Sequence, residues 1–357
     1  MNTIPSTFSE KLPSYTVLGG GDAARISGVS AVVLNRAGRI WKRPVFEELE
    51  KCGFDAIVSI EGSQEQYGLE ELMAGFPRLM FILVPKDVCT GCKINIAAHE
   101  IKSPLFFVLW DDQRLSGIKA ERINERLLKT NEELARDFSL GRASGKERPY
   151  KRFCTVPLIQ NNELQAIPTM NVPVQTRKSF ECSPFTAEKD DFPTLYPYDA
   201  AGVYDRARFI ELGGFDTAIT NPYWQTMDMG MRAWLWGEEI RCDKPIRLRI
   251  DGTGAREEAS ADESYRRFYL KNLAPAYRAV RPLAAAMRGT ERPPSAKGGA
   301  EASLPLVRFI PFMVRSRMGF SPAWRLFSAI RAWVKENKNR FQTDSRSLIR
   351  RWQEFLR

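Results

Sequence analysis

Short hydrophobic runs alternate with polar segments of helical spacing over the first third of the chain. The runs are six or seven residues long and rich in β-branched and aromatic side chains, which predicts buried strands over residues 29–34, 54–60, 79–84 and 105–110. Apolar positions that recur every three or four residues predict helices over 40–51, 70–74 and 93–101. This order predicts an α/β fold with a mostly parallel central sheet and right-handed crossovers.

The remainder of the chain is less regular. Residues 1–26 are expected to form an irregular lead-in, and the segment up to residue 197, rich in Pro, Asp and Thr, is expected to form loops. Hydrophobic spacing predicts further helices over 117–137, 224–237 and 257–287, and strands over 153–159 and 246–250.

Polar clusters follow three of the predicted strands. Asn35 and Arg36 follow the first, Glu61 ends the second, and Asp111 and Asp112 follow the strand at 105–110. Ligands of open α/β sheets bind outside the carboxyl ends of the strands, so these clusters favour a nucleotide or phosphate site. Two adjacent carboxylates there suit a hard cation such as Mg²⁺ or Mn²⁺. Capping of a strand at solvent is the alternative for this pair taken alone.

Several classes of protein are excluded or disfavoured by missing motifs. The chain has no Gly-x-Gly-x-x-Gly after the first strand and no Gly-x-x-x-x-Gly-Lys-Ser/Thr, so dinucleotide dehydrogenases and P-loop NTPases fit poorly. The single histidine, His99, excludes a multi-histidine metal site. Cys89 and Cys92 form one C-x-x-C without a second pair, which favours chance over a zinc or redox motif.

The order of the polar clusters resembles the nucleotide half of a family 2 glycosyltransferase of the GT-A fold. Leu34-Asn35-Arg36 resembles that family's Tyr-Asn-Arg, and residues 60–63 resemble its Asp-Asp-Gly-Ser. Residues 91–95 match its Gly-x-x-x-Ala-x-Asn loosely. The metal motif Asp-x-Asp is represented by Trp110 to Asp112 or by Asp111 to Gln113, with one ligand replaced in either alignment.

A second block resembles the sugar and acceptor half of the same family. Residues 198–216 resemble its small-residue strand, Arg and short helix that end in Gly-Gly-Phe-Asp, and residues 224–237 resemble its Trp-Glu-Asp helix. Asp228, Arg232 and Gly237 keep their places, but Gln225 and Thr226 replace the Glu-Asp pair that supplies the catalytic base. Neither an amide nor a hydroxyl accepts a proton at neutral pH, which leaves Asp228 as the candidate base.

The resemblance implies a GT-A nucleotide-sugar transferase domain over residues 27–252 that inverts the sugar's configuration. Nucleotide contacts are expected from Leu34, Asn35, Arg36, Glu61, Lys93 and Asp111, and a divalent cation (Mn²⁺ or Mg²⁺) on Asp111 and Asp112. Sugar or acceptor contacts are expected from Gly213, Gly214, Phe215, Asp216, Trp224 and Arg232. The alternatives are a catalytically inactive sugar-binding or glycan-binding homologue, supported by the missing Glu-Asp pair, and a sugar nucleotidylyltransferase, at which only Arg36 and Gly38 hint.

Positive charge is concentrated at the C-terminal end. Residues 281–357 carry 16 Lys or Arg against 5 Asp or Glu, whereas the whole chain has a net charge of only +10. After a linker over 291–303, helices opening near 321 and 344 carry basic residues opposite an apolar stripe. That pattern suits an anionic membrane surface, and packing on the catalytic domain or in a homodimer is the alternative.

The charge distribution also bears on partners and location. A neutral body with a basic extension, 253–357, disfavours a nucleic-acid groove and favours a glycan or lipid-linked acceptor of the cell envelope. No apolar run reaches the roughly 18 residues of a membrane span, and residues 1–11 lack the pattern of a secretory signal. We therefore expect a cytoplasmic protein that acts at the inner face of the membrane.

Overall fold

The computed structural model describes residues 12–20, 27–36, 42–62, 68–141, 152–175, 180–235, 238–250, 257–260 and 262–272. The predicted linker at 291–303, the two basic helices beyond it, and Gly38 and Gly237 lie outside these residues. Within them, no helix is both long and apolar enough to cross a membrane.

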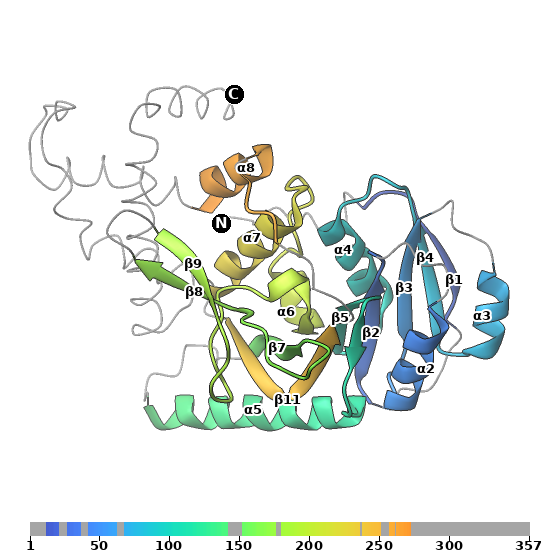
Figure 1. Ribbon diagram of the computed structural model, residues 1–357, viewed down its shortest axis with the longest axis horizontal. Coiled ribbons are helices and arrows are strands. Elements are labelled where there is room, and N and C mark those ends of the chain that lie inside the picture. The colour runs from blue at the N-terminus through green and yellow to red at the C-terminus, as the bar shows by residue number, and fades with distance from the viewer. Residues whose placement is uncertain are drawn as a thin grey trace, which may run out of the picture.

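The described residues contain a nine-stranded sheet with the order β1-β4-β3-β2-β5-β10-β7-β11-β6 (Figure 1). Its strands are β1 (Thr16–Gly19), β2 (Val29–Leu34), β3 (Ile57–Gly62), β4 (Leu79–Val84), β5 (Leu105–Trp110), β6 (Gln113–Leu115), β7 (Arg152–Gln160), β10 (Gly202–Asp205) and β11 (Glu239–Ile250). Strands β4, β3, β2 and β5 pair in parallel, and β7 and β11 run the same way, whereas β1, β10 and β6 are antiparallel to their neighbours. The sheet is therefore mostly parallel, as predicted.

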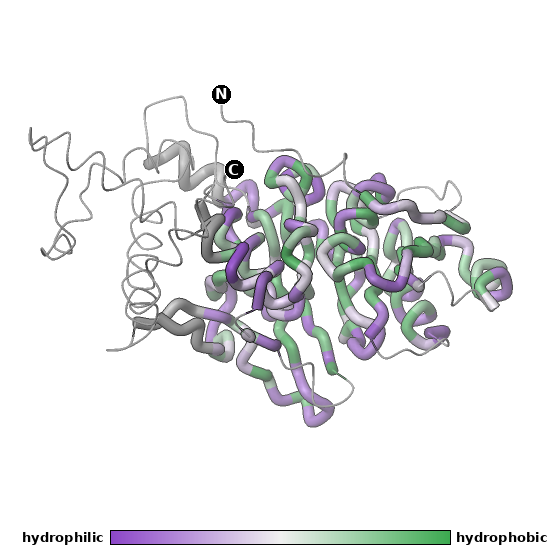
Figure 2. The backbone as a smooth tube through the Cα atoms, turned by 90° about the horizontal axis from the view of Figure 1, so that it is seen from above, coloured by the Kyte–Doolittle hydropathy of each residue, from purple (hydrophilic) through white to green (hydrophobic). Residues whose placement is uncertain are grey.

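Helices cover both faces of this sheet. They are α2 (Arg43–Cys52), α3 (Leu69–Gly75), α4 (Thr90–Glu100), α5 (Ala120–Gly141), α6 (Arg206–Glu211), α7 (Pro222–Leu235) and α8 (Glu263–Asn272). Alternate residues of β2 belong to two hydrophobic clusters: Val29 and Val33 pack with α2, α3 and α5, and Val32 and Leu34 pack with α4, α6 and α7. Burial on both faces explains the unbroken hydrophobic runs, and Figure 2 shows the hydrophobic segments inside and hydrophilic ones at turns and outer helix surfaces.

The prediction of the strands at 29–34, 79–84 and 105–110 is confirmed at the same bounds. Three irregular or unassigned segments were predicted wrongly. The lead-in contains β1, the region up to 197 contains a hairpin of β8 (Met170–Gln175) and β9 (Phe180–Phe185), and β6 begins directly after Asp112. β1 and β6 are only four and three residues long, so neither shows a hydrophobic period, and β1 is a partly exposed edge strand.

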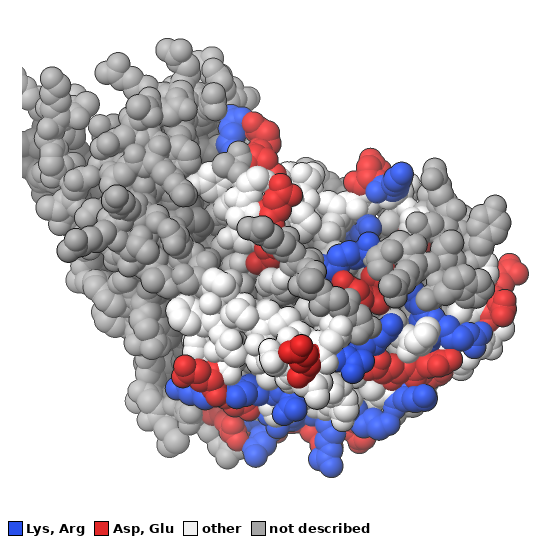
Figure 3. Space-filling view, in the orientation of Figure 1, with Lys and Arg blue, Asp and Glu red and all other residues white. Residues whose placement is uncertain are grey.

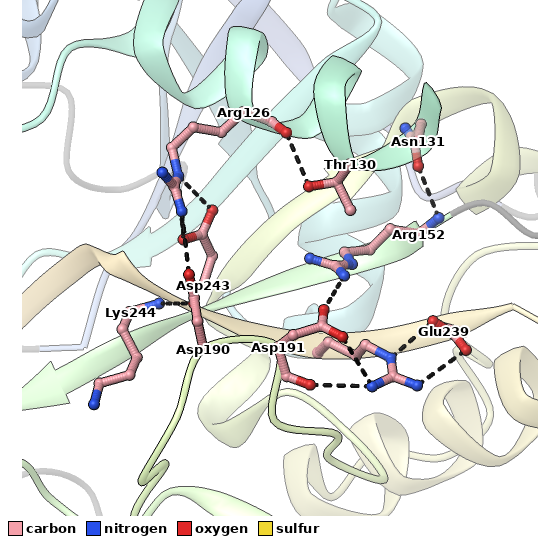
Figure 4. Close-up of polar contacts among 10 residues, drawn as sticks. Arg126, Thr130, Asn131, Arg152, Asp190, Asp191, Glu239, Asp243 and Lys244 are labelled. Carbon is pink, nitrogen blue, oxygen red and sulfur yellow. Dashed lines mark hydrogen bonds and ion pairs between the residues drawn. The ribbon is translucent and has the colours of Figure 1, made fainter. Parts of the chain in front are cut away.

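The strand predicted at 246–250 is longer than expected, because β11 begins at Glu239. Its charged half is accommodated by ion pairs (Figure 4). Arg126 of α5 pairs with the buried Asp243 at 2.6 Å, and Arg241 pairs with Glu239 at 2.7 Å and with Asp191 at 3.1 Å. The hydrogen bond to Asp243 raises the pKa of Arg126. Ion pairs thus satisfy the charged side chains of this half of β11, while Ile240 and Cys242 pack in the hydrophobic core.

On the face shown in Figure 3, basic and acidic side chains stand side by side along the lower edge, where α5 runs in Figure 1. Pairs on α5 such as Arg122 with Glu125 and Lys129 with Glu133 account for part of this mixture. This edge presents mixed charge rather than a continuous basic surface.

Candidate active site

The polar clusters predicted at three strand ends do meet at one edge of the sheet. The Asn35 amide, just after β2, donates a hydrogen bond of 3.0 Å to Glu61 at the end of β3. Glu61 also accepts hydrogen bonds of 2.6 Å from Ser59 and from the buried ammonium of Lys42. The backbone N–H of Asp111 donates to the carbonyl of Leu34, which ties β5 to β2.

Arg36 is the centre of this edge. Its backbone N–H donates to Asp111 Oδ1 at 3.0 Å, and its guanidinium pairs with Asp112 at 3.2 Å and with Asp199 at 2.6 Å. The same guanidinium lies 4.1 Å from the ring centroid of Trp110, within the range of a cation–π contact. Four contacts to two segments, residues 110–112 and Asp199, hold Arg36 in place, counting the stacking and the backbone N–H.

Arg36 and Trp110 line a cavity of about 260 Å³. The lining is completed by the start of α4, the turn at 199–200, the segment before α7, the start of α7 and the segment at 257–258. These residues are Thr90, Gly91, Ile94, Asp199, Ala200, Phe215, Asn221, Pro222, Tyr223, Gln225, Thr226, Glu257 and Glu258. The two sequence blocks that resemble the donor and the acceptor halves of the family therefore face one pocket.

Gln225 fastens α7 to the start of α4. Its Oε1 accepts a hydrogen bond of 2.9 Å from the backbone N–H of Gly91, and its Nε2 lies 3.3 Å from the carbonyl of Asp216 as a donor. A Cβ at Gly91 would lie 2.6 Å from Phe215 Cβ, so the close approach requires glycine. Asn95 adds two hydrogen bonds to the backbone of Phe215, at 2.8 and 2.9 Å. Gln225 lines the pocket, but the oxygen and the nitrogen of its amide are hydrogen-bonded to the backbone of Gly91 and Asp216.

Asp228, the predicted base, is fully buried and is not among the residues lining the pocket. Its carboxylate pairs with Arg232 at 2.9 Å, and Arg232 also donates to the carbonyls of Leu212 and Gly214. Gly213 and Gly214 have φ values of 82° and 62°, so the turn needs glycine. This geometry favours a structural role for Asp228 and Arg232, because a carboxylate with no accessible surface does not meet an acceptor hydroxyl.

Two further predicted sugar contacts also face helix α8 rather than the pocket. Asp216 pairs with Arg267 at 3.1 Å. The indole N–H of Trp224 donates to the carbonyl of Ser260 at 2.7 Å, and its ring stacks on Phe268. Of the predicted sugar and acceptor residues, Phe215 lines the pocket.

Lys93 lies on α4 one turn beyond its start and is not part of the pocket lining. Cys92, on the same turn, is buried, and burial raises its pKa to about 11, which disfavours a reactive thiol. The prediction that the Cys89 and Cys92 pair is a chance occurrence fits this environment.

Asp199 and Glu257 line the pocket and were missed by the sequence interpretation. Asp199 has a φ of 55°, in the left-handed region, and its carbonyl accepts a hydrogen bond of 2.8 Å from the Trp110 indole. Glu257 accepts hydrogen bonds from the Tyr196 hydroxyl at 2.9 Å and from the Asp199 N–H at 3.1 Å. Burial raises the pKa of Asp199 to about 6 and that of Glu257 to about 7.

The described residues include no group of three or more His, Cys, Asp or Glu arranged to hold a metal ion. Asp111 and Asp112 stand together at the end of β5, as predicted, with Arg36 against both. Any cation there would take its other ligands from water or from a bound phosphate, which is how Mg²⁺ is commonly held.

No protein-family model matches the chain, and no curated protein sequence does. Among solved structures it is similar to the crystal structure of GalNAc-T7 with UDP, GalNAc and Mn²⁺, at 13% identity and a TM-score of 0.50, over 84% of this chain. It spans 58% of that chain's length. It is also similar to Staphylococcus aureus TarS 1–349 in complex with UDP, at 9% identity and a TM-score of 0.45, over 87% of this chain and 91% of that one.

The likeness at these identities concerns the fold. The chain has an α/β fold with a large, mostly parallel central sheet flanked by helices, which matches GT-A glycosyltransferases. The predicted fold class is therefore confirmed.

Proposed function

We propose that the protein transfers a sugar from a nucleotide-diphosphate donor to a hydroxyl of a glycan or lipid-linked acceptor. The observation that carries this proposal is the meeting of three strand-end clusters beside a pocket lined by Trp110, Phe215 and Gln225. Asn35 contacts Glu61, and the next residue, Arg36, contacts Asp111 and Asp112. Ligands of open α/β sheets bind at this edge, and the fold is one that GT-A glycosyltransferases share.

The donor would lie across the ends of β2, β3 and β5. Asn35 and Glu61 would hold the nucleoside with Leu34, since their hydrogen bond fixes an amide and a carboxylate at this edge. Arg36 would meet the diphosphate because its guanidinium lines the pocket. Lys93, one turn into α4, would add positive charge nearby.

A divalent cation fits the donor set at Asp111 and Asp112. Both are hard oxygen ligands, and together with Asp199 they place three carboxylates around Arg36. Asp112 and Asp199 lie against its guanidinium, and Asp111 lies against its backbone N–H. A diphosphate would add further negative charge to these carboxylates, and Arg36 alone would not neutralise the sum. When bound, a Mn²⁺ or Mg²⁺ ion would neutralise the leaving diphosphate. Arg36 would then orient the phosphates beside it.

The sugar and the acceptor would occupy the cavity between Trp110, Phe215 and the start of α7. Gly213 and Gly214 would support Phe215 through the turn that Arg232 holds. We do not propose direct sugar contacts by Asp216, Trp224 and Arg232, because these side chains contact other protein residues. For the same reason we do not propose that Asp228 abstracts the proton.

We propose the same domain plan as the sequence predicted: a lead-in over 1–26, a transferase domain over 27–252 and a basic extension over 253–357. The first described helix of the extension, α8, packs on α7 through the stacking of Phe268 on Trp224. Its Arg267 pairs with Asp216, which precedes α7. An anionic membrane surface, the inner face of the cytoplasmic membrane and a homodimer remain predictions about the later helices.

A sugar-binding protein without catalytic activity is the second candidate, because α7 presents Gln225 and Thr226 where the family has acids. A turnover assay distinguishes the active transferase from the inactive sugar-binding protein. The full-length protein is incubated with UDP-, GDP- and dTDP-sugars and Mn²⁺, and release of nucleoside diphosphate is measured. Sustained release from one nucleotide class supports the transferase, and binding without release supports the inactive homologue.

A further inference from the structure

Inverting transfer needs a group that accepts the proton of the attacking hydroxyl, and α7 does not present one to the pocket. The Gln225 amide is bound to Gly91, and the Thr226 hydroxyl donates to the carbonyls of Pro222 and Tyr223 in its own helix. The Asp228 carboxylate is fully buried against Arg232. Among the described residues, a base must therefore come from another wall of the pocket.

Within the part of the chain that the structure describes, three carboxylates line the pocket: Asp199, Glu257 and Glu258. Asp199 is in a 2.6 Å ion pair with Arg36, which opposes its protonation. Glu258 is exposed and accepts a hydrogen bond from Ser260. Glu257 is held by two neutral donors, the Tyr196 hydroxyl and the Asp199 N–H, so its position is fixed without a neutralising cation in these contacts.

We infer that Glu257 is the general base of the proposed transfer, supplied by the segment after β11 in place of the acid missing from α7. This inference rests on the proposed function. As the acceptor oxygen bonds to the anomeric carbon, its proton passes to a Glu257 carboxylate oxygen. The bond between the anomeric carbon and the diphosphate oxygen breaks, and the diphosphate leaves with the electron pair.

The surroundings of Glu257 suit this role. Burial is the main cause that raises its pKa to about 7, the repulsion of Asp199 adds to it, and the two hydrogen bonds oppose it. The titratable groups that face it are Tyr196, Tyr198 and Asp199. A base with a pKa near the working pH is efficient, because a substantial fraction of it is ionised and it still binds the proton well.

The test compares Glu257→Gln with Glu263→Gln, an exposed control at the start of α8 that pairs with Arg266 and is not in the pocket lining. Both are made in the full chain and assayed for nucleoside diphosphate release from the sugar nucleotide that the wild type turns over, with water as acceptor. Glu257→Gln is expected to lower kcat by roughly 100-fold or more, with nucleotide Kd changed less than about twofold. Glu263→Gln is expected to keep kcat within about threefold.

A pH profile distinguishes a base from a merely structural residue. In the wild type, kcat should fall on the acid side of about pH 7, and Tyr196→Phe should move this limb to higher pH, because it removes a donor to the ionised carboxylate. Glu257→Gln should lose the limb. An unchanged kcat in Glu257→Gln would overturn the inference, and so would an acid limb that stays at the same pH in Tyr196→Phe. Neither result would bear on the proposed sugar transfer. A wild type that releases no nucleotide from any donor would overturn the proposed transfer, and the inference with it.

Discussion

The guanidinium of Arg36 lies over the indole of Trp110, 4.1 Å from the ring centroid. The two residues come from neighbouring parallel strands, because Leu34 of β2 stands opposite Trp110 of β5 in the register. Through this contact, Arg36 and Trp110 together line the pocket at the ends of the two buried strands. It also places a charge with a fixed orientation beside Asp111 and Asp112.

Replacing Arg36 should therefore weaken nucleotide binding. Arg36→Ala is expected to raise the Kd by about tenfold or more, about 1.4 kcal/mol, because the diphosphate loses a charged donor. Arg36→Lys should recover only part of this loss, since an ammonium cannot stack flat and bridge Asp112 and Asp199 together. Calorimetry with the preferred nucleotide measures both, with Arg122→Ala on α5 as an exposed control. Full affinity in Arg36→Lys would contradict the argument.

Asp228 is expected to matter for stability rather than chemistry. Asp228→Asn breaks a buried ion pair and should lower the free energy of unfolding by roughly 3 kcal/mol. The kcat of the folded enzyme should stay within a few-fold of the wild type. Urea unfolding and turnover are measured on the same samples. A loss of 100-fold in kcat with unchanged stability would restore Asp228 as the base.

Gly91 tests the close contact between α4 and α7. Gly91→Ala should lower stability by about 1–3 kcal/mol, because its Cβ would overlap Phe215 and Gln225. Gly62→Ala is the matched control, since a Cβ there would meet nothing within 4 Å and Gly62 has no positive φ. Thermal unfolding of the two variants should differ by several degrees. Equal melting temperatures would show that the contact is loose.

The two raised carboxyl pKa values predict a loss of stability on the alkaline side. Asp199 and Glu257 hold their protons more tightly when folded, so their contribution is full below about pH 4 and is lost as the pH rises through about 6 and 7. Glu257→Gln should remove its share, about 3 kcal/mol for a shift from 4.5 to about 7. Urea unfolding of wild type and variant at pH 4, 6 and 8 measures the difference. If the unfolding free energies of the wild type and Glu257→Gln changed equally with pH, the raised pKa of Glu257 would be ruled out.

The sequence predicted the polar edge of the sheet better than the surroundings of α7, for physical reasons. β2, β4 and β5 are buried on both faces, so their composition alone marks their bounds, and parallel strands bring their polar ends together. Around α7 the same residue types can either contact a ligand or pack against another element. Trp224 and Asp216 resemble sugar contacts in sequence, but α8 engages both.

The position of Glu257 in the pocket could not be predicted from any local sequence pattern. Its two hydrogen-bond partners lie 61 and 58 residues earlier in the chain, so neither its burial nor its place in the pocket is visible in its neighbours. β1 was missed for a different reason, because a short edge strand shows half-exposed positions without a hydrophobic run.

The central claim is a nucleotide-diphosphate site at the ends of β2, β3 and β5. The most direct measurement is titration calorimetry of the full-length protein with UDP, GDP and dTDP, with and without Mn²⁺, repeated on Asp112→Ala and on the exposed α5 control Glu133→Ala. The account predicts Mn²⁺-dependent binding of one nucleotide that is lost in Asp112→Ala and kept in Glu133→Ala. Absence of binding to all three nucleotides, or equal binding by Asp112→Ala, would contradict it.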